Sequence, residues 1–149
     1  MSSSPREPRP DGFDYKERET EVIHLIEMSI EALSHMKFSP EPDMDNMAKW
    51  LANEAVTHSR SLEGEVQAKA LKQLSDCCGA RNEWLEAVMA LEKAKLADED
   101  DWTPDDNHIL RVCQKFAGIG ERRKAMGLPL ELGGWEKHAK RQFSVLTDR

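Results

Sequence analysis

Glutamate and histidine residues at helical spacing are the first groups in this chain that could do chemistry. Glu21 and His24 have the Glu-x-x-His spacing with which helical bundles bind metal ions. Such sites take the motif from two helices, and here it occurs once. Glu54 and His58 are four residues apart, which is the spacing of ordinary partners on a helix surface. A carboxylate–histidine metalloprotein therefore stays an alternative hypothesis, and the sequence predicts neither a metal site nor a cofactor.

The three cysteines, Cys77, Cys78 and Cys113, are the other candidates for reactive groups. Cys77 and Cys78 precede Gly79 at the expected end of a helix, where the negative pole of the helix dipole disfavours a thiolate. We therefore expect buried structural thiols. An odd number of cysteines argues against a disulfide framework and for a reducing compartment, so the predicted location is the cytoplasm.

Other catalytic motifs are missing from the sequence. The acidic run 98–106 lacks the glycine-containing loop and the bidentate glutamate of a calcium site. Gly118 and Gly120 do not follow a strand, so they do not form a phosphate-binding loop. There is no nucleophile elbow and no dinucleotide fingerprint. We predict that the protein is not an enzyme and name no catalytic residue.

The elements that would position these residues are all predicted to be helices. Apolar residues recur at helical spacing, and no segment alternates with the period of a strand. Asp14, Asp43, Ser61 and Thr103 are expected to cap helices, and the fourth helix is expected to begin near Asn82. The glycines after residue 117 predict a loop-rich stretch. The expected inner faces are Val22, Ile23, Ile26, Ile30 and Leu33; Met44, Met47, Ala48, Leu51 and Ala55; Val66, Ala70, Leu74 and Cys77; Leu85, Val88, Met89 and Leu91; Ile109, Val112, Cys113 and Phe116; Trp135, Ala139, Phe143 and Leu146.

The chain has 149 residues, which suits one domain with its own core. Residues 1–12 are rich in serine and proline and are expected to be a disordered tail, with a single helical domain over 13–149. No apolar run is long enough to span a membrane. The predicted fold is an all-α, compact bundle of five or six amphipathic helices, in which helical-hairpin, repeat-like packing is an option.

Charge divides this domain into an acidic part over 13–106 and a basic part over 107–149. Residues 1–106 hold 12 Lys/Arg and 24 Asp/Glu, whereas residues 107–149 hold 9 and 4. Such asymmetry is evidence about partners. The expected partner-binding residues are cations opposite the apolar faces, joined by Trp102 in the acidic linker: Arg111, Lys115, Arg122, Arg123, Lys124, Lys137, Lys140, Arg141 and Trp102.

The kind of partner follows from the overall charge. The net charge of −7 repels a polyanion, and Trp135 and Phe143 are expected to face the core rather than stack on bases. We therefore predict a non-catalytic adaptor or accessory subunit that binds the acidic patch of another protein. A small subunit that binds nucleic acid through the same cations is the alternative, and self-association stays open. The acidic part of the chain itself could also cover the basic surface. Trp50 and Trp84 are expected to pack in the core.

One segment resembles a known repeat family. Leu71, Leu74, Ser75 and Cys78, followed by Trp84, Ala87, Leu91 and Ala94, match the helix-pair pattern of one tetratricopeptide unit over residues 68–101. The resemblance implies two packed helices and a protein-binding role. The windows on either side do not match this pattern, whereas stable arrays of such units need about three repeats.

Overall fold

A computed structural model describes residues 15–38 and 43–127, together with Ala139, Arg141, Phe143 and Val145. The described elements are α1 (Tyr15–Phe38), α2 (Met44–His58), a 3₁₀ turn η1 (Ser59–Ser61), α3 (Gly64–Ala80), α4 (Trp84–Ala97) and α5 (Pro104–Ala125). No strand occurs among the described residues, and the helices pack into a compact bundle. The prediction of an all-α fold is confirmed. The predicted tail over 1–12, the Asp14 cap and the expected face residues Trp135 and Leu146 lie outside the described residues.

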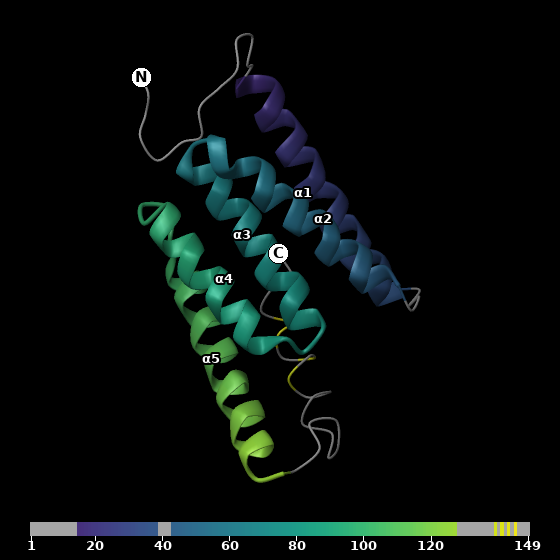
Figure 1. The fold of residues 1–149 in the computed structure, drawn as a ribbon, viewed down its shortest axis with the longest axis vertical. Helices are drawn as coiled ribbons and strands as arrows, with labels where there is room; N and C mark the ends of the chain where they lie inside the picture. The colour runs from purple at the N-terminus through teal and green to yellow at the C-terminus, as the bar shows by residue number, and fades with distance from the viewer. Residues whose placement is uncertain are drawn as a thin grey trace.

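The helices pack mainly against their neighbours in sequence. α1 pairs with α2 and α3 pairs with α4, while α2 contacts α3 and α4 contacts α5. α1 also packs against α3, which is two helices further along the chain. As a result α3 lies in the middle of the array, and α1 and α5 lie at opposite edges (Figure 1). This is the helical-hairpin packing that the sequence left as an option.

Four apolar clusters among the described residues hold the array together, and the two largest join different sets of helices. One joins α1, α2 and α3 and includes Val22, Ile26 and Val66. The other joins α3, α4 and α5 around Trp84 and Phe116, whose ring centroids are 5.0 Å apart. Phe143 joins this second cluster near the C-terminus. The predicted inner positions Ile109, Val112, Cys113, Phe116, Ala139 and Phe143 are all buried.

A buried polar network ties α1, α2 and α3 together. Gln73 Nε2 on α3 donates to Ser29 Oγ on α1 at 3.0 Å. The Ser29 hydroxyl donates in turn to the Ala48 carbonyl on α2 at 2.8 Å. Cys77 Sγ lies 3.3 Å from Ser29 Oγ. Because buried polar groups cost free energy unless they are hydrogen-bonded, this network favours one relative position of the three helices.

Several large apolar residues that were predicted to pack in the core lie on the surface. Trp50 is 60% exposed, and the correction applies equally to Ile23, Ile30, Met47, Leu85 and Met89. Trp84, which was also expected to pack in the core, is buried at the centre of the second apolar cluster. The physical reason is that alanines form the inner faces of α2 and α4, for example Ala52 and Ala94 at 0% exposure. Small side chains let helix axes approach closely, which turns the larger neighbours outward.

The boundaries of three helices differ from the prediction. α5 continues through Gly118 and Gly120 to Ala125, where a loop was expected, and the chain then leaves the helix at Gly127 with φ +73°. Cations in its last turn suit the negative pole of the helix dipole. α4 begins at Trp84 rather than at Asn82, which adopts a left-handed φ of 60°. Ser61 does not cap α3, whose N-cap position is Glu63, and the Asp43 side chain makes no cap hydrogen bond at α2.

The start of α5 forms as predicted. Thr103 Oγ1 accepts from the Asp106 backbone N–H, and Asp106 Oδ2 accepts from the Thr103 N–H, which makes a capping box. Lys72 Nζ on α3 lies 2.8 Å from Asp106 Oδ2. Burial by itself would raise the pKa of Asp106, but the Lys72 ammonium and the Thr103 N–H lower it below its usual value. One carboxylate thus holds α5 against α3.

We expect the stability of the protein to fall at acid pH through Asp106. Because its pKa is lowered in the folded state, Asp106 stabilises the fold above the unfolded pKa of about 3.9, and the stabilisation disappears as pH falls through the folded pKa. Asp106→Asn should lower the free energy of unfolding near neutral pH by about 1–2 kcal/mol. Urea denaturation between about pH 7 and pH 2.5 should show this difference shrinking below about pH 4. A difference that is constant with pH would contradict the assignment.

Candidate functional site

Three of the predicted cations form a line on the outer face of α5. Arg111, Lys115 and Arg122 are spaced four and seven residues apart, so they share one side of the helix. All three are exposed, and the buried residues Ile109 and Phe116 lie on the opposite side. We call these three residues the α5 cation row. The row extends over twelve residues, or about 16 Å of helix.

Gly118 leaves room for this row. It occupies the same side of α5 between Lys115 and Arg122. The Arg122 guanidinium folds back along the helix, and its Nη1 lies 4.0 Å from the position that a Gly118 Cβ would take. The glycine that looked like a loop residue in the sequence thus separates two cations on one continuous helix. This arrangement was not predicted, because the helix was expected to end before Gly118.

The other predicted site residues do not extend this line. Lys124 is exposed but lies about 200° around the helix from Arg122. Arg123 is half-buried, and Arg141 is exposed on a separate segment near the C-terminus. Lys137 and Lys140 lie outside the described residues. Among the described residues, the row holds three of the eight predicted cations. A surface formed by all eight stays a prediction.

The α5 cation row forms no ion pair with the described residues of the acidic part of the chain. Among the described residues, no ion pair joins Arg111, Lys115 or Arg122 to a carboxylate. Many of the acids instead pair with cations elsewhere. Arg81 Nη1 lies 2.9 Å from Asp45 Oδ2, for example. The sequence left open that the acidic part of the chain covers the basic surface. Among the described residues, no carboxylate pairs with these three cations.

Trp102 is half-buried and is held between helices. Its indole Nε1 donates to Asn107 Oδ1 at 2.6 Å. The ammonium groups of Lys72 and Lys95 lie 5.7 Å and 6.0 Å from its ring centroid, within the range of cation–π attraction. Trp102 thereby links α3, α4 and α5. A role for it in partner binding stays a prediction.

The cysteines are buried, free and poorly suited to chemistry at neutral pH. Burial raises the pKa of Cys77 to about 11 and the pKa values of Cys78 and Cys113 to about 12. Because the thiolate is the nucleophile and the metal ligand, these thiols are unreactive near pH 7. The prediction of buried structural thiols is confirmed.

Cys78 nevertheless lies close to two carboxylates. Its sulfur and carboxylate oxygens of Glu83 and Glu86 are within 4.8 Å of one another. These three groups could together ligate a metal ion. Lys49 Nζ donates to Glu83 Oε1 at 2.7 Å and to Glu86 Oε1 at 3.2 Å, so its ammonium group already neutralises the two carboxylates. Glu21 and His24, the other candidate ligands, are exposed on α1.

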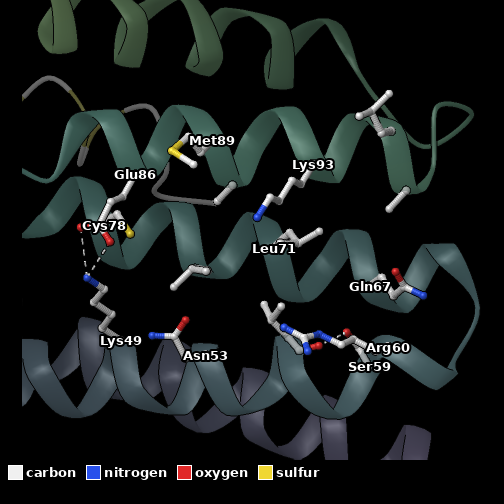
Figure 2. A pocket seen from close by; sticks show the side chains of 15 residues that line it. Lys49, Asn53, Ser59, Arg60, Gln67, Leu71, Cys78, Glu86, Met89 and Lys93 are labelled. Carbon is white, nitrogen blue, oxygen red and sulfur yellow. Dashed lines mark hydrogen bonds and ion pairs between the residues drawn. The ribbon is translucent and has the colours of Figure 1, made fainter. Parts of the chain in front are cut away.

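A groove between α2 and α4 is the feature that the sequence analysis missed (Figure 2). Its volume is about 640 Å³, with α3 contributing Leu71 and Leu74 between the two flanking helices. The α4 side includes Met89 and Leu96, which are 50% and 76% exposed. The only sequence signal was that α4 carries large apolar residues on two sides, and both were interpreted as core.

In comparisons with known proteins, no family model, no curated protein and no solved structure matches this chain. The class of protein is therefore given by its fold: an all-α array of helical hairpins. Within it, the positions of α3 and α4 that resemble a tetratricopeptide unit do pack as a hairpin, and Trp84, Ala87, Leu91 and Ala94 are buried. None of the described helices combines the length and apolar character that crossing a membrane requires.

Proposed function

We propose that this protein is a non-catalytic helical adaptor or accessory subunit that binds an acidic region of another protein through the α5 cation row. The observation that carries the proposal is that Arg111, Lys115 and Arg122 share one exposed face and form no ion pair among the described residues. Unpaired cations in a line attract a complementary acidic surface and orient its approach.

The charge of the whole chain favours protein over nucleic acid as the partner. A net charge of −7 repels the dense negative charge of a nucleic acid at long range, whereas an acidic patch on a protein is a weaker and more local field. Stacking on bases would need exposed aromatic rings beside the cations. Phe143, one of the two aromatic residues of the basic part considered for that role, is 3% exposed.

Charge reversal tests the proposal. The double variant Arg111→Glu/Lys115→Glu should lose at least about 90% of a partner that the immobilised wild-type chain retains from native lysate, because attraction becomes repulsion across the same face. Lys16→Glu/Lys69→Glu changes the net charge equally on exposed positions of α1 and α3, and should retain the partner. Thermal melting would verify that both variants are folded.

Two outcomes would contradict this function. Equal recovery by the two double variants would remove the α5 cation row from recognition. Tight binding of a labelled DNA or RNA duplex at low salt, lost in Arg111→Glu/Lys115→Glu, would replace the protein partner by nucleic acid.

A further inference from the structure

The groove between α2 and α4 has the length and the lining of a binding site for a helix. Along α4 it extends from Glu86 to Ala97, which is about 16 Å or three helical turns. On the opposite side it is bounded by α2 and η1 residues from Lys49 to Arg60. We call this feature the α2–α4 groove. It lies on elements other than α5, so it is a site separate from the α5 cation row.

Apolar side chains line the groove, and two of them on α4 are exposed. Leu71 and Leu74 of α3 lie between the two walls, and Val56 of α2 is half-buried. On α4, Met89 and Leu96 are 50% and 76% exposed. A group of exposed apolar residues beside a hollow indicates an interaction site more than a freely solvated surface.

The charges in the groove are mainly positive, although this part of the chain is acidic. Figure 2 shows Lys93 pointing from α4 into the groove, and Arg60 lies on the α2 side. Both are exposed, and neither forms an ion pair among the described residues. Glu86, the only acid among the described residues of the lining, is paired with Lys49 at 3.2 Å. The ligand that complements this lining is therefore acidic.

We infer that the α2–α4 groove binds one amphipathic α-helix of a partner protein, with acidic residues beside its apolar stripe. A bound helix would place apolar side chains at positions i, i+3 or i+4, and i+7 against Leu71, Leu74 and Met89. Its carboxylates would reach Arg60 and Lys93. This mode supplies the apolar anchor that the α5 cation row lacks, since the binding energy of interfaces is concentrated in a few buried side chains.

A peptide selection on the intact chain tests this inference. The probe is a display library of peptides of about 18 residues with a fixed amphipathic leucine pattern and randomised charged positions, with affinities then measured by fluorescence anisotropy. The selected peptides should be enriched in glutamate and aspartate. Arg60→Glu/Lys93→Glu should weaken their binding at least about tenfold, and Met89→Asp should weaken it through the apolar contact. Both variants change exposed residues, so the fold should persist.

The control separates this site from the function proposed above. Arg111→Glu/Lys115→Glu should leave peptide affinity within about twofold of the wild-type value, because the α5 cation row is not part of the groove. The inference is overturned if no peptide is selected, if the selected peptides are neutral or basic, or if Arg60→Glu/Lys93→Glu binds them as well as the wild type does. None of these outcomes bears on the α5 cation row.

Discussion

Replacing Trp84 with alanine should lower the free energy of unfolding by about 3–5 kcal/mol. Trp84 is 4% exposed and lies between two aromatic rings, with its ring centroid 5.0 Å from that of Phe116 and 5.2 Å from that of Phe143. Its removal would leave a cavity where α3, α4, α5 and the C-terminal segment meet. Urea denaturation followed by circular dichroism would measure the loss.

Trp50→Ala is the matched control for this prediction. Trp50 is 60% exposed on α2, so its truncation should change the free energy of unfolding by no more than about 0.5 kcal/mol. The sequence analysis assigned both tryptophans to the core, and the structure separates them. Losses of similar size in the two variants would contradict the orientation of α2 and α4 described above.

Phe143→Ala should also destabilise the fold by about 3–5 kcal/mol, and its effect should be coupled to Gly79. The Phe143 ring lies directly over Gly79, where a side-chain Cβ would overlap ring carbons Cε2, Cζ and Cδ2. Gly79→Ala should therefore cost about 1–3 kcal/mol in the wild-type background, because the ring must move. With Phe143 truncated to alanine, that space is open and most of the Gly79→Ala penalty should disappear.

A double-mutant cycle measures the coupling between these two positions. The coupling free energy between Gly79→Ala and Phe143→Ala should exceed about 1 kcal/mol, which is well above the scatter for independent sites. Strictly additive effects would show that Phe143 does not lie on Gly79. Gly118→Ala serves as a control on α5, because a Cβ there would meet no other atom closer than 4.0 Å.

The sequence predicted the helices better than it predicted their orientation. Thr103, Pro104 and Asp106 marked the start of α5 correctly because capping is local chemistry that three neighbouring residues complete. The predicted inner faces of α2 and α4 were only partly right: they included exposed residues such as Met47 and Met89, because hydrophobicity alone favours large residues as core. Close packing here uses alanine, such as Ala52 and Ala94, and close packing is a property of two helices together.

The candidate site was only partly predictable for the same reason. The cations of α5 could be found from composition, but the α5 cation row required a helix that continues through Gly118 and Gly120. The α2–α4 groove depends on three helices whose mutual positions are set by long-range contacts such as Gln73 to Ser29. The pairing of Lys49 with Glu83 and Glu86 likewise joins residues more than thirty positions apart. Helical spacing within one segment carries no information about such contacts.

The most direct test of the proposed function is the salt dependence of partner binding. The dissociation constant of the captured partner would be measured for the wild type and for Arg111→Gln/Lys115→Gln between about 0.05 M and 0.5 M salt. If the α5 cation row contacts carboxylates, the variant binds about tenfold more weakly at low salt, and the difference shrinks to about twofold or less at high salt as charges are screened. Equal affinity of the two proteins at low salt would contradict the account, and so would a difference that salt does not change.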